Sequence, residues 1–501
     1  MGNLQNTAVL ILGLGQSGLA MARWCARSGA RVTVADTREV PVNLERLRGE
    51  LPNVQFISGA FTAQLIAGTE IRAVFVSPGL SPIQVAPVLI AARAIGISVS
   101  GEINLFSRAL EALASDQDYH PKLLAITGTN GKTTVTSLTA QLVGRSGKSV
   151  AAAGNIGPSL LDSLTQRIDA KTLPDVWVLE LSSFQLNDVD NFSPTLGAVL
   201  NLSQDHLDWH GSMQAYAAAK SKVFGKEGPM LLNRDDRQVM AMLPGLVKGK
   251  QLREYTTFGA DMPARPGDFG METVNGMTWL VKALEADETR RRRKDDVQEI
   301  YIQRLIPADA LRIRGKHNAS NALAALALAL AADCALGPML YGLREYRGEP
   351  HRVESIAIVN DVEYFDDSKG TNVGATVAAL HGLGQERKLV IILGGEGKGQ
   401  DFEPLVNPVG RHTRAVVLIG KAADAIALVL SPLSVPVERA GSMQEAVETA
   451  NRHAHAGDAV LMSPACASFD MFENYEHRAQ VFRDAVAALV GDINVVVEKA
   501  A

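Results

Sequence analysis

The sequence predicts an α/β protein of three domains, each built around a mainly parallel β-sheet. Short apolar runs typical of buried strands alternate along the chain with segments typical of helices, which is the pattern of repeated βαβ units. A domain takes about 150 residues, so a chain of 501 residues is long enough for about three hydrophobic cores. We expect a Rossmann-like N-terminal domain at 1–118, a central domain at 119–348 and a C-terminal Rossmann-like domain at 349–501.

Composition excludes several classes of protein. The chain has 49 basic and 54 acidic residues, a net charge of −5, so we expect no nucleic-acid partner. The three cysteines, Cys25, Cys334 and Cys466, are too widely spaced for a disulfide framework or a zinc site and suit a reducing compartment. There is no signal-peptide pattern. The apolar run Ala322 to Ala332 is too short to span a bilayer, and we expect a buried helix there. We therefore expect a cytoplasmic protein without a membrane partner, and a monomer.

A glycine-rich turn follows the first predicted strand. Thr7 to Leu12 is apolar and is followed by GLGQSG, which matches GxGxxG, and the second predicted strand ends at Asp36. The pattern indicates a diphosphate-bearing ligand at 13–18, with Asp36 in contact with a hydroxyl or a base. A turn that serves only tight packing, or an NAD site, stays possible at this point. The polar stretch 115–121 is predicted to be the linker to the next domain.

The stretch LLAITGTNGKTTV, at 123–135, carries the strongest motif. An apolar strand leads into a loop with Gly128 and Gly131, and Lys132 opens a helix, so backbone N–H groups and the helix N-terminus can approach phosphate oxygens. Lys132 can reach the β/γ-phosphates and the Thr133 hydroxyl can bind Mg²⁺. Ile126 stands where the full GxxxxGK[ST] motif has glycine. We predict a P-loop-type ATPase domain, with ATP as the ligand.

Polar side chains follow two further strands of this domain. Glu180 ends the run at 176–179, where open α/β sheets place their ligands, so it is a candidate Mg²⁺ ligand. His206 follows the run at 196–200 between two aspartates and is a candidate for a functional role. Lys220, in AAAKSKVF, is most simply a surface residue on sequence alone.

A charged insert at 285–299 contains four consecutive arginines, Arg290 to Arg293. Acidic residues bracket them on both sides, which favours a solvated loop over a nucleic-acid site.

In the third domain, polar loops follow three predicted strands. They read DDSKGTN (366–372), GGEGK (394–398) and SPACASFD (463–470), and they present Lys369, Lys398 and Ser468 at one sheet edge. Such a cationic edge suits a small anionic substrate. Cys466 has no general-base histidine near it in sequence, so we interpret it as a packing residue.

Together these motifs resemble the Mur ligases of peptidoglycan precursor synthesis over essentially the whole chain. The segments that carry the resemblance are GTNGKTT, ELSSFQL (180–186), the 201–208 segment, HNASNALAAL, the HR pair at 351–352, DDSKGTN and SPACASFD. GLGQSG with Asp36-Thr37-Arg38, DDSKGTN and SPACASFDMF are most similar to the members that add D-glutamate. Folylpolyglutamate synthase shares the central ATP region but is not expected to carry this N-terminal domain.

The resemblance implies an ATP-dependent amide ligase. ATP would phosphorylate the carboxylate of UDP-N-acetylmuramoyl-L-alanine, and the amine of D-glutamate would attack the acyl phosphate. Such a reaction depends on positioning and charge neutralisation. The UDP-sugar then replaces NAD as the expected ligand of the glycine-rich turn.

The resemblance also implies site residues for ATP and metal. ATP would contact Gly128, Thr129, Asn130, Gly131, Lys132, Thr133, Thr134, Asn318, Asn321, Arg352 and Asp367. The catalytic residues would be Lys132, His206, Lys220 and Lys369. Two Mg²⁺ ions would be held by Thr133, Glu180, His206 and Lys220, the last as a carbamate formed with CO₂. This implication reverses the surface interpretation of Lys220.

The other two substrates would lie in the outer domains. The UDP-sugar would contact Gln16, Ser17, Asp36, Thr37, Arg38, Gly79, Asn155, Ser182 and Gln185. D-Glutamate would contact Thr371, Lys398, Ser468, Phe469 and Tyr475.

Two features depart from the family pattern, and other functions stay open. Glu396 stands where the pattern GGDGK has Asp, and the region 262–299 is longer and more charged than the family needs. The alternatives are a related Mur ligase or polyglutamate-type ligase with another amino acid, an NAD-dependent oxidoreductase, and a homologue that binds but does not catalyse.

Overall fold

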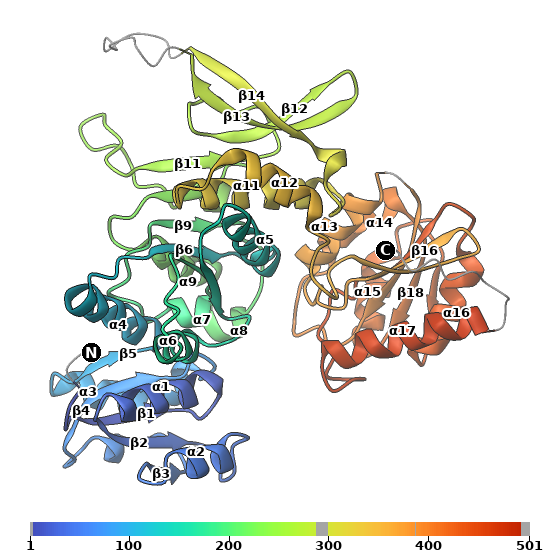
Figure 1. Cartoon of the computed structure of the whole chain (residues 1–501). Coiled ribbons are helices and arrows are strands. Elements are labelled where there is room, and N and C mark those ends of the chain that lie inside the picture. The colour runs from blue at the N-terminus through green and yellow to red at the C-terminus, as the bar shows by residue number, and fades with distance from the viewer. Residues whose placement is uncertain (1–3, 287–298, 386, 492–501) are drawn as a thin grey trace.

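The computed structural model describes residues 4–286, 299–385 and 387–491. Among these residues the strands form four sheets, three of them mainly parallel and flanked by helices, as the alternating pattern predicts (Figure 1). The three α/β units follow one another along the chain, with the third beside the central one (Figure 1). The α/β class expected from the sequence is confirmed.

The first unit is a parallel sheet in the order β3-β2-β1-β4-β5. Alternate residues of β1 face opposite sides, so Val9 and Ile11 pack against α1 and α4 while Leu10 and Leu12 pack against α3. The elements are β1 (Ala8–Leu12), α1 (Gln16–Arg27), β2 (Arg31–Asp36), α2 (Leu44–Glu50), β3 (Gln55–Ser58), η1 (Ala63–Leu65), β4 (Ile71–Val76), α3 (Pro82–Ala94), β5 (Ser98–Ser100) and α4 (Glu102–Gln117).

The central unit is a parallel sheet in the order β11-β10-β9-β6-β8-β7, with helices on both faces. The helix α11 lies along α5 on one face, and its alanine and leucine side chains are buried, which confirms the buried helix expected there. The elements are β6 (Lys122–Thr127), α5 (Lys132–Arg145), β7 (Val150–Gly154), α6 (Leu160–Asp169), β8 (Val176–Glu180), α7 (Ser183–Leu186), β9 (Leu196–Val199), α8 (Leu207–His210), α9 (Met213–Ser221), η2 (Lys222–Phe224), β10 (Met230–Asn233), α10 (Arg237–Met240), β11 (Tyr255–Phe258), α11 (Lys316–Ala331) and α12 (Leu336–Glu345).

An antiparallel sheet, β12-β13-β14, is inserted before α11 and projects from the top of the molecule (Figure 1). Its strands are β12 (Phe269–Val274), β13 (Met277–Glu285) and β14 (Ile300–Pro307), followed by the short turn η3 (Ala308–Ala310). The insert expected as a solvated loop at 285–299 therefore joins β13 to β14, and its residues 287–298 lie outside the described residues.

The third unit is a sheet in the order β15-β16-β20-β17-β18-β19, in which β15 is the antiparallel edge strand. One face packs against α13, α14 and α15 and the other against α16 and α17. The elements are β15 (Glu354–Val359), β16 (Val362–Asp366), α13 (Val373–Leu383), β17 (Leu389–Gly394), η4 (Glu403–Leu405), α14 (Val406–His412), β18 (Thr413–Ile419), α15 (Ala423–Leu430), β19 (Val437–Arg439), α16 (Met443–His453), β20 (Ala459–Met462) and α17 (Tyr475–Gly491).

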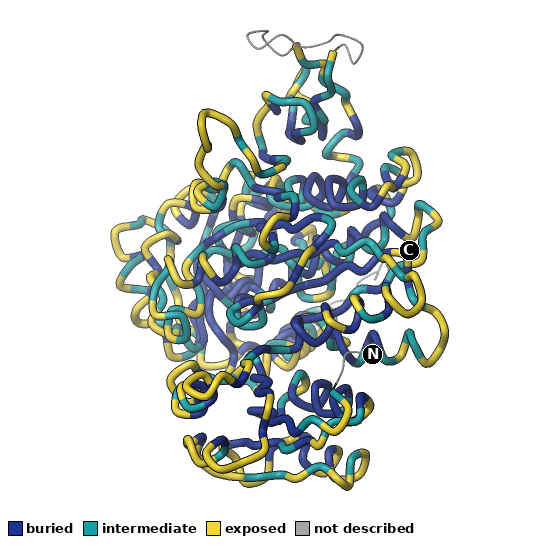
Figure 2. Tube along the Cα trace, turned by 90° about the vertical axis from the view of Figure 1, so that its left-hand side faces the viewer, coloured by how far each residue is buried: buried dark blue, intermediate teal, exposed yellow. Residues whose placement is uncertain are grey.

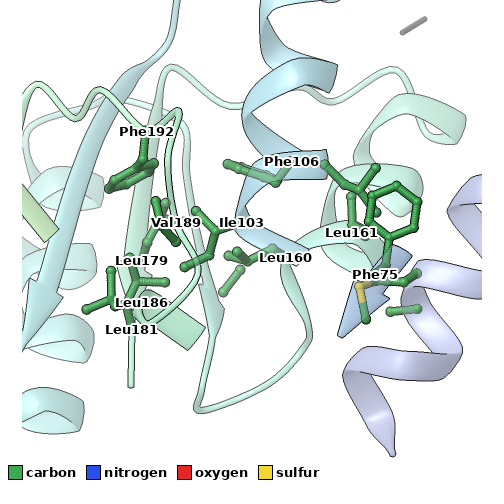
Figure 3. Close-up of a cluster of buried hydrophobic side chains, with 14 of the residues drawn as sticks. Phe75, Ile103, Phe106, Leu160, Leu161, Leu179, Leu181, Leu186, Val189 and Phe192 are labelled. Carbon is green, nitrogen blue, oxygen red and sulfur yellow. The ribbon is translucent and has the colours of Figure 1, made fainter. Parts of the chain in front are cut away.

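A continuous apolar core joins the first unit to the central one. Helix α4 brings Ile103 and Phe106 against Leu160 and Leu161 of the central unit (Figure 3). The ring of Phe106 meets the ring of Trp177 edge to face, with centroids 5.3 Å apart. Helix α4 continues to Gln117, so the expected linker at 115–121 is helical over its first residues.

Buried residues are concentrated in the sheets and in α11, while exposed residues lie on the loops and on the outer helix faces (Figure 2). Within the described part of the chain, no helix is both long enough and apolar enough to cross a membrane.

We predict that Phe106→Ala lowers the free energy of unfolding by about 3–5 kcal/mol, because it leaves a cavity in the core shared by two units. Urea denaturation followed by tryptophan fluorescence measures this loss. Ile83→Ala is the control, since Ile83 is 85% exposed on α3 and the change should stay within about 0.5 kcal/mol. Equal stability of the Phe106→Ala variant and the wild type would contradict the shared core.

Candidate active site

The loop between β6 and α5 has the geometry of a phosphate loop. Gly131 adopts φ 82°, and a Cβ there would lie 2.8 Å from Asn321 Oδ1, so a larger residue would be strained and would push the Asn321 side chain aside. The Lys132 ammonium donates to the carbonyls of Gly128 and Thr129, both at 2.9 Å. Burial lowers the pKa of Lys132, Glu180 opposes this effect, and the charge of Arg352 adds to it.

The segment that follows β9 holds this loop in place. The amide of Asn201 accepts from the backbone N–H of Asn130 at 2.8 Å and donates to its carbonyl at 3.0 Å. The Thr129 hydroxyl accepts from the N–H of Ser203 at 3.0 Å. Two neighbouring strand ends are thus fixed to each other, which gives the loop one conformation.

Glu180 lies at the end of β8, as the strand-end argument predicts. It is buried, and its Oε1 accepts from the side chain of Asn155 at 2.8 Å. Its Oε2 has no hydrogen-bond partner among the described residues. A buried carboxylate oxygen without a partner is costly, and a cation would satisfy it. The residues therefore fit a divalent metal.

His206 lies beyond β9 and is partly exposed. Its Nε2 is 3.6 Å from the carboxylate of Asp205, and its ring meets that of Phe184 at 4.7 Å. Partial burial lowers the pKa of His206, Asp205 opposes this, and the charges of Lys132 and Lys220 lower the pKa further. A neutral imidazole is the form that binds metal.

Lys220 is buried, so its interpretation as a surface residue is wrong. Only 2% of the residue is exposed, and its ammonium donates to the carbonyl of Gly128 at 2.8 Å and to Thr127 Oγ1 at 3.3 Å. Burial, together with the charge of Lys132, lowers the pKa of Lys220 well below its usual value. The local sequence could not show this, because α9 packs its Lys220 face under the phosphate loop.

A cavity of about 540 Å³ opens between the central and third units, next to the phosphate loop. Arg352 crosses from the third unit and donates to Thr133 Oγ1 at 2.8 Å. Burial raises the pKa of Asp367 to about 7, although Ser463 donates a hydrogen bond to it at 2.6 Å. Of the expected ATP-site and catalytic residues, the cavity is lined by Asn130, Gly131, Thr134, Asn318, Asn321, Arg352, Asp367 and Lys369.

The same cavity has lining residues that our sequence argument missed. Asn233 is the last residue of β10 and Asp235 follows it, so the strand-end argument used for Glu180 would have found both. His317 is partly buried, its buried Nδ1 has no hydrogen-bond partner among the described residues, and desolvation lowers its pKa to about 4. No local signal separates His317 from a packing residue.

The third unit gathers the residues expected for D-glutamate at two cation–aromatic pairs. Lys369 Nζ lies 5.0 Å from the centre of the Tyr475 ring, and Lys398 Nζ lies 5.5 Å from that of Phe469. Phe469 is 64% exposed, whereas Ser468 is buried. Thr371 stays beside Lys369, since its N–H donates to the Lys369 carbonyl at 2.9 Å.

Arg478 was missed from the sequence, yet it holds the loops of this edge together. Its guanidinium is fully buried and donates to the carbonyls of Ser368 at 2.7 Å and Cys466 at 3.1 Å. Burial lowers the pKa of Arg478 to about 10 and raises the pKa of the Cys466 thiol to about 12. Glu396, the departure from GGDGK, pairs through its backbone with Ala467 at 2.9 and 3.1 Å.

In the first unit the glycine-rich turn lies beside Asp36. A Cβ on Gly18 would lie 2.0 Å from the carbonyl oxygen of Gly13, so glycine allows α1 to pack onto the turn. Asp36 accepts from the Leu14 N–H at 2.7 Å and from the Arg38 guanidinium at 2.8 Å. Burial raises the pKa of Asp36, but these hydrogen bonds outweigh it and lower the pKa to about 2.

The other residues expected for the UDP-sugar lie on several elements. Gln16 and Ser17 open α1, Thr37 follows β2, and Gly79 follows β4. Ser182 and Gln185 form the capping box of α7, with the Gln185 N–H donating to Ser182 Oγ at 3.2 Å. These two side chains therefore have a structural role whether or not they bind a ligand.

Three family models match this chain. "Mur ligase MurD-like, N-terminal domain" matches residues 7–101, "Mur ligase middle domain" matches 126–329, and "Mur ligase, glutamate ligase domain" matches 351–466.

Similar curated proteins extend over the whole chain. A UDP-N-acetylmuramoylalanine–D-glutamate ligase from Albidiferax ferrireducens is 67% identical, covering 100% of both chains. One from Burkholderia cenocepacia is 55% identical, covering 98% of this chain and 99% of that protein. Among solved structures, the MurF ligase from Thermotoga maritima in complex with ADP has a TM-score of 0.56 at 14% identity, covering 97% of this chain and 96% of that chain. On these matches, the chain belongs to the Mur ligase family.

Proposed function

We propose that this enzyme is an ATP-dependent ligase that joins D-glutamate to UDP-N-acetylmuramoyl-L-alanine in peptidoglycan precursor synthesis. The proposal is supported by relatives of that name, 55–67% identical over the whole chain. The observation that carries the chemistry is the contact of Arg352 with Thr133. This contact joins the phosphate loop to the third unit, which is the unit proposed to bind the amino acid. We further propose that the enzyme acts as a monomer in the cytoplasm, with small-molecule substrates alone.

The reaction begins with transfer of the γ-phosphoryl group of ATP to the substrate carboxylate. The loop N–H groups and Lys132 hold the phosphates, and Arg352 neutralises charge from the opposite side. The adenosine portion occupies the cavity lined by Asn318 and Asn321, with Asp367 at its third-unit wall. Lys369, whose pKa is lowered by burial and by Arg352, faces the same space.

Magnesium fits the donors at this site. Thr133, Glu180 and His206 would hold it, and the unpartnered Oε2 of Glu180 is the observation that supports this. When bound, the ions supply charge neutralisation for the phosphates. Lys220 is proposed to carry a carbamate, because burial favours the neutral amine, which is the form that adds CO₂, and the product offers an anionic metal ligand.

The two acceptor substrates approach from the outer units. The UDP portion lies at the turn 13–18 beside Asp36, and its sugar extends toward Asn155 of the central unit. The amine of D-glutamate attacks the acyl phosphate while Lys398 and Ser468 hold its carboxylates. Positioning of this kind can supply much of the rate.

The proposed reaction predicts phosphate release with one amino acid. Purified enzyme with Mg·ATP and UDP-N-acetylmuramoyl-L-alanine should release phosphate on addition of D-glutamate, and not with L-glutamate, meso-diaminopimelate or L-lysine. A coupled phosphate assay measures this. Phosphate release with another amino acid would still support an amide ligase but would overturn the assignment of the D-glutamate site. Release with none of them would overturn the proposed reaction.

We predict that Lys220→Ala lowers kcat by roughly 100-fold or more, because it removes the anionic ligand proposed for the metal. A short carboxylate such as acetate should restore part of the activity, since it can enter the space left by the side chain. Lys226→Ala is the control, because Lys226 is an exposed lysine a short distance along the chain. Full activity of the Lys220→Ala variant, or ¹³CO₂ labelling that leaves Lys220 without a carbamate signal, would contradict the assignment.

A further inference from the structure

One cluster of ionisable side chains in the third unit is not used by the proposed mechanism. His351, Glu354 and Asp366 place their ligating atoms within 4.8 Å of one another. The cluster already holds a cation, since the guanidinium of Arg483 on α17 donates to Glu354 Oε2 at 2.6 Å and to Asp366 Oδ2 at 3.3 Å. It is therefore an ion-pair network rather than a metal site.

Asp366 fixes the tautomer of His351 in this network. The carboxylate is fully buried, and its Oδ1 accepts from the N–H of Ser368 at 3.0 Å and from its hydroxyl at 2.5 Å. Its Oδ2 is 2.7 Å from His351 Nδ1. Asp366 Oδ2 also accepts from Arg483, so in the neutral imidazole the proton lies on Nδ1, facing this oxygen, and Nε2 keeps its lone pair.

The backbone of His351 is also held in an unusual conformation. Its φ of 62° is in the left-handed region, which is unfavourable for a non-glycine residue. Its N–H donates to Glu354 Oε2 at 2.9 Å, and its carbonyl accepts from the Lys369 N–H at 3.2 Å. Strain that the surroundings enforce is typical of functional sites.

The imidazole lies where the amino acid is proposed to bind. Its ring meets the ring of Tyr475 edge to face at 74°, with centroids 6.1 Å apart, and Lys369 Nζ lies over the same tyrosine ring at 5.0 Å. His351 and Lys369, which is expected to be catalytic, therefore both contact the ring of Tyr475. The His351 side chain is 23% exposed, so a small ligand can reach it.

The proposed reaction needs a base at this place. D-Glutamate arrives as an ammonium ion, whose nitrogen has no lone pair to attack the acyl phosphate. A base must first remove a proton, and a histidine oriented by a carboxylate is a common solution.

We propose that His351, oriented by Asp366, accepts a proton from the D-glutamate ammonium. One N–H bond of the substrate breaks and an N–H bond forms at His351 Nε2, leaving a neutral amine. The amine adds to the acyl carbon, the bond from that carbon to the phosphate oxygen breaks, and phosphate leaves. The second nitrogen proton passes to an oxygen of the departing phosphate as the amide forms, and the imidazolium returns its proton to water. This inference rests on the proposed function.

Two other groups could compete for the role, and both are otherwise occupied. His206 lies among the residues proposed to hold metal, beside Lys132 and Lys220. Asp367 accepts from the Ser463 hydroxyl at 2.6 Å and the Val353 N–H at 3.3 Å and is buried against the sheet end. In contrast, no hydrogen bond of the described residues engages His351 Nε2.

The test compares two nucleophiles in the variant His351→Gln. Glutamine keeps a donor for Asp366 but has no basic nitrogen. Amide formation with D-glutamate should fall roughly 100-fold or more. Hydroxamate formation with hydroxylamine, which is already unprotonated near neutral pH, should change little, because that nucleophile needs no base. In the variant His351→Ala, added imidazole should restore part of the amide rate.

The matched control is His453→Gln, which removes another histidine bonded to a carboxylate, here Glu438 at 2.5 Å, from the surface of the same unit. It should behave as wild type in both reactions. Equal loss of amide and hydroxamate in His351→Gln would overturn the base role and leave a positioning role. An unchanged amide rate would also overturn it. A wild-type enzyme that forms neither product would instead contradict the proposed function.

Discussion

The candidate site depends on the hydrogen bond between Arg352 and Thr133, which joins the third unit to the phosphate loop. A second contact supports it, since the side-chain amides of Asn130 and Asn372 exchange hydrogen bonds at 3.2 and 3.3 Å. Asn372 also caps α13 by accepting from Ala375 N–H at 2.9 Å. The first turn of α13 is thus fixed to the phosphate loop, so the central and third units form one cavity.

Buried charge is the second constraint on this site. Lys132 and Lys220 both donate to the carbonyl of Gly128, and burial lowers the pKa of each. Glu180 opposes this effect on both lysines, and one of its oxygens lacks a partner among the described residues. Such an arrangement is costly without ligands, and the phosphates and metal ions proposed for this site would complete the charge balance.

Much of the fold and of the nucleotide site could be predicted from local sequence. Glycine, lysine and threonine at fixed spacing after an apolar strand predict a strand–loop–helix turn, and the structure has this turn between β6 and α5. Glu180 followed from its place at a strand end. Cys466 was predicted to pack and is buried.

The rest depends on contacts between elements distant in sequence. Lys220 is buried because α9 packs beneath a loop some ninety residues earlier, which no local pattern shows. Arg478, on α17, joins the loop after β16 to the loop after β20 through the carbonyls of Ser368 and Cys466. His351 gains a defined tautomer from Asp366, which belongs to the next strand but one. The resemblance to a family supplied the assignment of Lys220 that the residues alone could not.

The most direct test of a site shared between units is a double-mutant cycle on ATP binding. Arg352→Met, Thr133→Val and the double variant would be compared with wild type by isothermal titration calorimetry. If the two residues depend on each other, their losses of ATP-binding free energy should be non-additive, with an interaction energy of about 1 kcal/mol or more. Losses that add to within about 0.5 kcal/mol would show two independent residues and contradict the account.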